Sequence, residues 1–278
     1  MNYRHIYHAG NPADVVKHVL LIHIIRAMQL KAAAYFYLDT HAGIADYDTQ
    51  AEAALKTEES IAGVGKVLSH PNLPEALHDY LAVIRGYDAE GRYYPGSPRV
   101  ARLLARPQDR LALCELHPED VHTLRRGFYN DPQAAVHHRN GYEALKALLP
   151  PEEKRGLILI DPPFEKTTEF ADMTKAVAEA LKRFPTGCYL LWFPIKKRFE
   201  VEQFYQNIAA ANFPKTLAVE VMFRPDDTPE GLNGTGLVIV NPPFAAVAGI
   251  EPLVTALGSL YSQPHGYTRQ FWLVEETK

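Results

Sequence analysis

The chain has 278 residues, of which 47% are hydrophobic and 22% are charged. This composition is that of a folded globular protein and excludes a disordered or fibrous chain. The net charge of -4 and the isoelectric point near 6.3 exclude binding to nucleic acid through overall positive charge, so any such binding must use a local patch. No apolar run reaches the roughly 18 residues of a membrane span, and the N-terminus lacks the apolar core of a signal peptide. We therefore expect a cytoplasmic protein without a membrane segment.

A helix is expected near the N-terminus. Asn11 is a favourable N-cap, and Pro12 suits the first helical position. Apolar residues then recur at helical spacing and give one apolar face: Val15, Val16, Val19, Leu20, Ile24 and Met28. The aromatic-rich run "AYFYLDTHAG" that follows predicts a buried strand, closed by a tight turn at Gly43.

Residues 46–108 interrupt the strand-helix pattern and are interpreted as a mostly helical insertion. Two helices are expected within 51–68 and 73–87, and the turn-rich "YYPGSP" leads into a third, "RVARLLA". On this interpretation, residues 1–45 and 109–278 form one Rossmann-like domain, and residues 46–108 form a helical insertion subdomain.

Strands and helices alternate after the insertion. Apolar strands are expected at 110–116, 134–138, 156–160, 187–193, 215–223 and 234–240, with helices at 118–128, 141–149, 169–184 and 198–211. Strands that are continuous apolar runs predict a parallel sheet covered on both faces. The last two strands follow each other through a polar loop, which predicts a hairpin. A mostly parallel α/β sheet with a final antiparallel strand is the architecture of class I S-adenosylmethionine-dependent methyltransferases.

Ligands of such sheets bind beyond the carboxyl ends of the strands, so the residues at those ends are the candidates for a site. Gly43 permits the positive φ and close approach that a cofactor at a turn requires. Glu115 ends the second strand, where an acid can accept ribose hydroxyls. In this architecture about 20 residues usually separate the glycine turn from this acid. Here the insertion lengthens the separation between Gly43 and Glu115 to roughly 70 residues. Asn140-Gly141, after the third strand, could contact the adenine of the cofactor or form a plain turn.

The fourth strand ends in Asp161-Pro162-Pro163-Phe164. Prolines stop a strand, so termination alone could explain the motif. However, methylating an exocyclic amine requires acceptors for the two amine hydrogens, which an aspartate oxygen and a backbone carbonyl held by proline can supply. Phe164 could stack on a flipped-out base. We therefore predict that Asp161, Pro162 and Phe164 are catalytic.

A near copy of this motif, Asn241-Pro242-Pro243-Phe244, ends the last of these strands. Because that strand should run antiparallel to the others, its carboxyl end should lie at the opposite edge of the sheet. The copy is therefore predicted to have no catalytic role, although an asparagine can also accept hydrogen bonds.

Histidines are frequent near the N-terminus, but their spacing does not match a metal-binding helix, and no metal site is expected. Tyr3, Arg4 and His5 interleave aromatic and basic side chains, a composition typical of RNA contact. A frayed terminus is the alternative.

Several stretches together resemble the bacterial large-subunit ribosomal RNA adenine-N6 methyltransferases of the RlmJ type, over essentially the whole chain. They are, in order, "YRHIYHAGNPADVVKH", "YLDTHAG", "YYPGSP", "CELHP", "NGYEAL", "GLILIDPPF" and "VNPPF". The N-terminal stretch is the most specific. Two departures are Phe164, where related enzymes often have tyrosine, and Asn140, where the family more often has aspartate.

The resemblance implies S-adenosylmethionine as cofactor, and adenine 2030 of 23S ribosomal RNA as the target of a monomeric enzyme. It further implies that Tyr3 contacts the RNA near the active site and that Asp161 is the catalytic acceptor. The cofactor contacts that it implies are His18, His41, Ser97, Glu115, Asn140, Gly141 and Asp161, with Lys17 as a weaker candidate for the cofactor carboxylate. Within the same chemistry, a DNA adenine-N6 or protein glutamine methyltransferase remains an alternative. A non-catalytic RNA-binding protein that retains the cofactor pocket is the alternative from another class.

Overall fold

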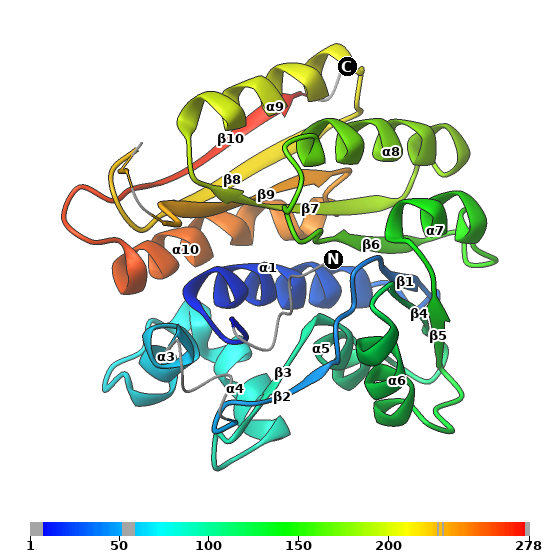
Figure 1. The fold of residues 1–278 in the computed structure, drawn as a ribbon, viewed down its shortest axis with the longest axis horizontal. Helices are drawn as coiled ribbons and strands as arrows, with labels where there is room; N and C mark the ends of the chain where they lie inside the picture. The colour runs from blue at the N-terminus through cyan, green and yellow to red at the C-terminus, as the bar shows by residue number, and fades with distance from the viewer. Residues whose placement is uncertain (1–7, 52–58, 227, 230, 276–278) are drawn as a thin grey trace.

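A computed structural model describes residues 8–51, 59–226, 228, 229 and 231–275. Its central element is a sheet of eight strands in the order β10-β8-β9-β7-β6-β1-β4-β5 (Figure 1). The strands are β1 (Phe36–Asp39), β4 (Arg110–Glu115), β5 (Ala134–His138), β6 (Gly156–Ile160), β7 (Cys188–Ile195), β8 (Thr216–Met222), β9 (Gly234–Val240) and β10 (Thr268–Val274).

The direction of the strands follows the prediction for most of the sheet. β1 pairs in parallel with β4 and β6, β4 with β5, and β6 with β7. β9 lies antiparallel between β7 and β8, which confirms the hairpin. β10 was not predicted; it adds an edge strand antiparallel to β8. The carboxyl ends of β1, β4, β5, β6 and β7 therefore meet at one edge of the sheet.

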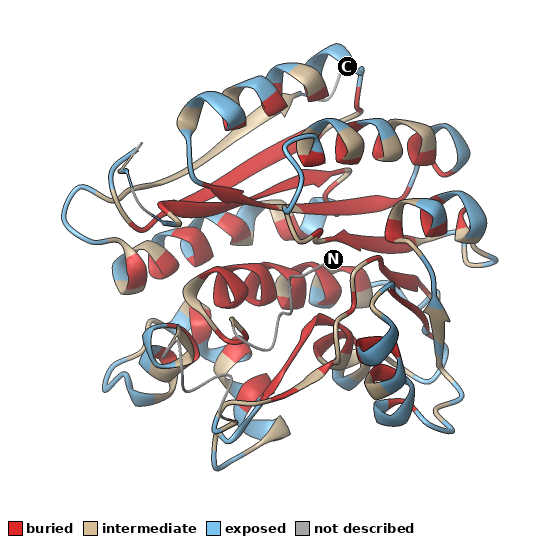
Figure 2. Cartoon of the chain, in the orientation of Figure 1, coloured by how far each residue is buried: buried red, intermediate tan, exposed pale blue. Residues whose placement is uncertain are grey.

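Helices cover both faces of this sheet, and the sheet between them is the most buried layer of the molecule (Figures 1 and 2). One face carries α7, α8 and α9, and the other carries α1, α5, α6 and α10. Their bounds are α1 (Pro12–Gln29), α5 (Ser97–Leu104), α6 (Pro118–Gly127), α7 (Gly141–Leu148), α8 (Glu169–Arg183), α9 (Arg198–Ala210) and α10 (Phe244–Tyr261).

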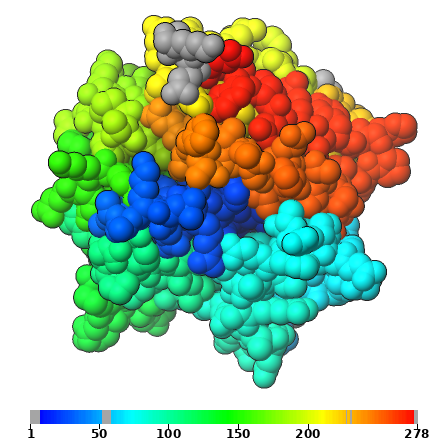
Figure 3. Space-filling model, turned by 180° about the vertical axis from the view of Figure 1, so that it is seen from behind, coloured from blue at the N-terminus to red at the C-terminus, as the bar shows by residue number. Residues whose placement is uncertain are grey.

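The start of α1 forms as the sequence predicts. Pro12 occupies the first turn, and the Asn11 side chain accepts a hydrogen bond from the Asp14 N–H at 2.8 Å. Almost the whole helix is buried, because it lies between the sheet, α10 and the segment 46–108. Figure 3 shows α1, α10 and that segment adjoining on the back of the molecule.

Segment 46–108 contains short helices and two strands too short to be predicted from alternation. The strands β2 (Asp46–Asp48) and β3 (Tyr93–Pro95) pair antiparallel. A π-helix, η2 (Ile61–Gly65), continues into α3 (Lys66–Ser69), and a 3₁₀ turn, η3 (Glu75–Leu77), continues into α4 (His78–Tyr87). Part of the first expected helix, residues 52–58, lies outside the described residues.

By length and composition, α10 is long and apolar enough to cross a membrane, contrary to the expectation that no segment would be. Its buried residues fall at helical spacing, Ala246, Ile250, Leu253, Val254, Leu257 and Tyr261 among them. They pack against α1 and β8. One face of α10 is therefore buried inside the fold.

Candidate active site

A cavity of about 1140 Å³ opens at the carboxyl edge of the parallel strands. Every predicted site residue that the structure describes lines it: Lys17, His18, His41, Gly43, Ser97, Glu115, Asn140, Gly141, Asp161, Pro162 and Phe164. They come from α1, from the ends of β1, β4, β5 and β6, and from segment 46–108. The predicted RNA contacts Tyr3, Arg4 and His5 lie outside the described residues.

Asp161 follows β6 directly and is held by a buried lysine from α1. The Lys17 ammonium donates to Asp161 Oδ2 at 2.5 Å and to Asp14 Oδ1 at 2.8 Å. Burial would lower the pKa of Lys17, but the two carboxylates outweigh burial and raise it well above its ordinary value. Lys17 is therefore a permanent cation, and Asp161 Oδ1 has no hydrogen-bond donor within the described part of the chain.

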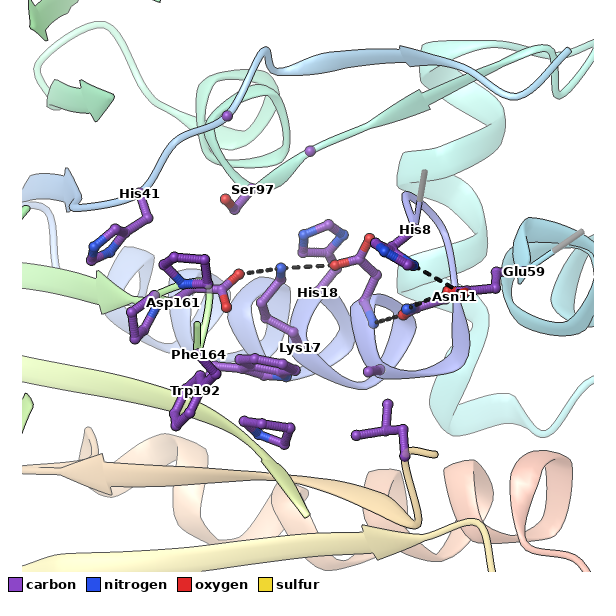
Figure 4. A pocket seen from close by; sticks show the side chains of 18 of the residues that line it. His8, Asn11, Lys17, His18, His41, Glu59, Ser97, Asp161, Phe164 and Trp192 are labelled. Atoms are coloured by element: carbon purple, nitrogen blue, oxygen red, sulfur yellow. Dashed lines mark hydrogen bonds and ion pairs between the residues drawn. The ribbon is translucent and has the colours of Figure 1, made fainter. Parts of the chain in front are cut away.

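The polar chain continues from Asp14 into segment 46–108 (Figure 4). Asn11, which caps α1 through Asp14, donates from Nδ2 to Glu59 Oε2 at 3.0 Å. Glu59 Oε1 pairs with His8 Nδ1 at 2.9 Å, and this hydrogen bond raises the pKa of His8. The Val64 N–H donates to the Gly10 carbonyl. The inserted segment thus fixes the start of the helix that carries Lys17.

Phe164 stands in a backbone conformation that bulky residues rarely adopt, with φ of 48°. Its ring packs edge-on against Phe170, with centroids 5.0 Å apart, and against Trp192, at 5.9 Å. Lys17 Nζ lies 5.9 Å from the Trp192 ring centroid. Aromatic rings and the Lys17-Asp161 pair therefore share one part of the cavity.

The end of β1 presents a second buried acid. Asp39 Oδ2 accepts hydrogen bonds from Ser97 Oγ at 2.7 Å and Tyr37 OH at 2.8 Å. Burial raises the pKa of Asp39 to about 6, although these two donors oppose the shift. Asp39 thus fixes the Ser97 side chain at the cavity wall.

The turns after β1, β4 and β5 approach one another closely. Glu115 accepts from the backbone N–H of Gly43 at 2.9 Å and of His117 at 2.7 Å, while burial raises the pKa of Glu115. Gly43 has the predicted positive φ, at 61°. A Cβ on Gly141 would lie 2.3 Å from the Thr40 carbonyl oxygen, so only glycine fits there.

Asn140 and the two predicted histidines are engaged in structural contacts. Asn140 Oδ1 caps α7, accepting from Tyr142 N at 2.9 Å, which is the turn role left open by the sequence. His18 Nδ1 bonds Tyr94 OH at 2.7 Å. Burial lowers the pKa of His41 to about 4, so its ring is neutral near pH 7. Among the described residues, no group of three or more potential ligands could hold a metal ion.

The second motif lies far from this cavity. β9 runs antiparallel to β7 with Val240 opposite Tyr189, so Asn241 sits at the amino end of β7. Asn241 Nδ2 donates to the carbonyls of Pro185 and Gly187 at 2.8 and 3.0 Å. The predicted direction of this strand end is confirmed, and the two motifs occupy opposite edges of the sheet.

The sequence model of the family described as "Ribosomal RNA large subunit methyltransferase D, RlmJ" matches residues 32–274. The chain belongs to this family. One relative, named "Ribosomal RNA large subunit methyltransferase J", comes from Escherichia coli strain K12. It is 39% identical to this chain, and the match covers 99% of this chain and 100% of the relative. The Haemophilus influenzae relative of the same name is 40% identical, covering 92% of each.

Two solved structures are similar to this chain in fold. A Legionella pneumophila protein superposes with a TM-score of 0.87 and 36% identity, covering 95% of this chain and 98% of the other. A second structure is a probable spermidine synthase from Corynebacterium glutamicum, with a TM-score of 0.53 and 11% identity. The match covers 94% of this chain and 77% of the synthase chain, and it shows a shared fold alone. The predicted class I S-adenosylmethionine-dependent methyltransferase fold is confirmed.

Three residues in or beside this cavity were not identified from the sequence. Asp14 lies three residues before Lys17 on α1, a spacing that could have predicted their contact. Trp192 lies inside an apolar strand and resembles a core residue in sequence. Asp39 ends the predicted strand just before the turn, and its hydrogen bonds to Tyr37 and Ser97 have no signal in the sequence.

Proposed function

We propose that this chain transfers a methyl group from S-adenosylmethionine to the N6 amine of an adenine in 23S ribosomal RNA, adenine 2030 by family resemblance. The observation that carries the proposal is the Asp161 carboxylate at the carboxyl end of β6. Its Oδ2 is fixed by Lys17, its Oδ1 is left for an amine hydrogen, and Phe164 lines the same cavity. The names of the relatives support ribosomal RNA as the substrate.

The cavity residues fit S-adenosylmethionine, which would supply the methyl group. Glu115, held by two backbone N–H groups and buried, lines the cavity with a carboxylate that can accept ribose hydroxyls. The same cavity is lined by Gly43, Ser97, His41 and the Asn140-Gly141 turn. His18 and Lys17 complete the proposed contacts, and two of the three Lys17 ammonium hydrogens are already used by Asp14 and Asp161.

The protein groups act on the amine by position and charge. Asp161 Oδ1 and the Pro162 carbonyl accept the two amine hydrogens, which localises the nitrogen lone pair and stabilises the positive charge that develops. Asp161 then holds the proton that the methylated amine releases. Phe164 stacks on the base, a contact worth about 1–3 kcal/mol. Tyr3, Arg4 and His5 remain the proposed RNA contacts of the N-terminal segment, in a cytoplasmic, monomeric enzyme.

A methylation assay on three substrates tests this proposal. Protein-free 23S ribosomal RNA, duplex DNA and a peptide release factor would each be incubated with labelled cofactor, and mass spectrometry would locate N6-methyladenine in the RNA. We expect transfer to the RNA alone. Transfer to DNA or to a glutamine would replace the proposal with the corresponding activity. Binding of the demethylated cofactor product without turnover on any RNA would show a non-catalytic protein.

A further inference from the structure

Several arginines form ion pairs inside the fold. Arg99 pairs with Asp46, Arg102 with Asp131 and Arg106 with Asp109. Arg198, which follows β7, pairs with Glu220 and Asp226. These side chains tie elements together, so they are poor candidates for contact with a ligand.

Three lysines on the cavity wall differ from them. Lys66 begins α3, Lys166 lies in the loop after Phe164, and Lys196 follows β7 directly. All three are exposed, and none forms an ion pair within the described part of the chain. Lys66 lies over the ring of Tyr261, another cavity residue, with Nζ 5.8 Å from the ring centroid. Three separate elements therefore bring exposed positive charge to the lining of one cavity.

The other acids that line the cavity, Asp120 and Glu169 among them, form no ion pair with these lysines in the described part of the chain. Asp14 and Asp161 share Lys17, Glu59 is bound by His8 and Asn11, and Glu115 accepts two backbone hydrogen bonds. Glu165 also lies on the exposed rim, which leaves more positive than negative side chains there. In a chain with a net charge of -4, this rim is a local basic patch of the kind that nucleic-acid contact requires.

We propose that Lys66, Lys166 and Lys196 bind the phosphates that flank the adenosine inserted into the cavity. The inference rests on the proposed function, because a base that reaches Asp161 leaves its own sugar-phosphate backbone at the opening. Lysine suits this task since its ammonium binds phosphate as a point charge and needs no fixed geometry. The rim thereby holds the backbone of the substrate strand, while Asp161 and Phe164 act on the base.

Salt dependence of RNA binding tests the proposal. The probe is a fluorescein-labelled single-stranded RNA of about 16 nucleotides, and anisotropy gives its affinity at several salt concentrations. Each phosphate contact on a single strand contributes about 0.7 to the slope of log affinity against log salt. We expect Lys66→Gln, Lys166→Gln and Lys196→Gln each to reduce the slope by that amount and the triple variant to reduce it by about 2. Between 50 and 200 mM salt, the triple variant should therefore lose about twentyfold less affinity than the parent.

Lys197→Gln is the matched control. Lys197 adjoins Lys196 in sequence and is also exposed, but it does not line the cavity. Its Nζ forms an ion pair with Glu200 Oε1 at 3.8 Å. Its replacement should leave the slope unchanged. Equal slopes for the parent and the triple variant would overturn the proposal. A loss of affinity for the demethylated cofactor product at an unchanged RNA slope would also overturn it and assign the rim to the cofactor.

Binding to the labelled RNA is measured without turnover, so failure of this proposal is distinct from failure of the proposed function. If the parent does not methylate 23S ribosomal RNA but the slopes change as expected, the rim binds RNA in a protein of another activity. If the parent methylates the RNA and the slopes do not change, the activity stands and the rim is excluded.

Discussion

The two Xaa-Pro-Pro-Phe motifs both follow a buried strand, yet they place the left-handed residue at opposite ends. In the copy it is Asn241, with φ of 52°, a residue type that tolerates this conformation. In the first motif it is Phe164, with φ of 48°, which costs on the order of 1–3 kcal/mol. Packing against Phe170 and Trp192 offsets that cost. The comparison shows a relaxed turn at one edge and a strained one beside the cavity.

The aromatic residues differ in the same way. Phe244 is the first residue of α10 and is 89% exposed, whereas Phe164 is partly buried among aromatic rings. Asn241 satisfies two backbone carbonyls of the fold, whereas Asp161 has one oxygen engaged by Lys17 and one without a donor in the described chain. The two motifs share the three residues Pro-Pro-Phe, yet one forms a structural turn and the other places a carboxylate and an aromatic ring at the cavity.

The largest contrast is expected from removing the first side chain of each motif. Asp161→Ala should lower turnover by about 10² to 10⁴, because the amine loses its charged acceptor. Affinity for the demethylated cofactor product, measured by titration calorimetry, should change much less. Asn241→Ala serves as the control, with turnover close to that of the parent. Equal losses in the two variants would mean that the copy also takes part in catalysis.

The aromatic residues give the next largest contrast. Phe164→Ala removes a stacking contact of about 1–3 kcal/mol, so kcat/KM for RNA should fall by roughly 5- to 150-fold. Phe244→Ala removes an exposed ring and should leave steady-state kinetics on 23S ribosomal RNA unchanged. Phe164→Tyr should retain the activity, since the stacking face remains. Loss of activity in Phe164→Tyr as large as in Phe164→Ala would exclude stacking as the role of this ring.

Converting the first motif into the copy tests the charge alone. Asp161→Asn keeps an oxygen acceptor for the amine, but the hydrogen bond is no longer charge-assisted. A neutral hydrogen bond is weaker by about 1.4 kcal/mol, so kcat should fall roughly tenfold. Single-turnover measurements would show whether the loss lies in the chemical step. A loss as large as that of Asp161→Ala would indicate that the position of the carboxylate, held by Lys17, matters more than its acceptor oxygen.

Most of the sheet could be predicted because its strands are continuous apolar runs between clear helices. β10 could not, since all seven of its residues are only partly buried and Arg269 within it pairs with Glu220 of β8. β2 and β3 have three residues each, too few to show alternation. Edge strands and short pairs depend on tertiary contacts that a local pattern does not contain.

The position of the site could be predicted because parallel strands deliver their carboxyl ends to one edge, and Gly43, Glu115 and Asp161 end such strands. The bond between Lys17 and Asp161 could not, because it joins residues 144 positions apart. Nor does any local signal reveal the positive φ of Phe164, a residue type that normally avoids it. Strain at this position is visible only after the surrounding rings are placed.

The smallest effect, on stability alone, separates the tasks of the two motifs. Asn241→Ala loses the hydrogen bonds to two backbone carbonyls. It also places alanine, which adopts the left-handed conformation less readily than asparagine, at a φ of 52°. We therefore expect the free energy of unfolding to fall by about 2 kcal/mol. Asn241→Gly loses the same hydrogen bonds but adopts the conformation freely, and it should lose about 1 kcal/mol less than the alanine variant. Urea unfolding at constant m-value measures both losses. Equal losses would show that the backbone conformation at Asn241 carries no cost, and the contrast with the strained Phe164 turn would then rest on side-chain contacts alone.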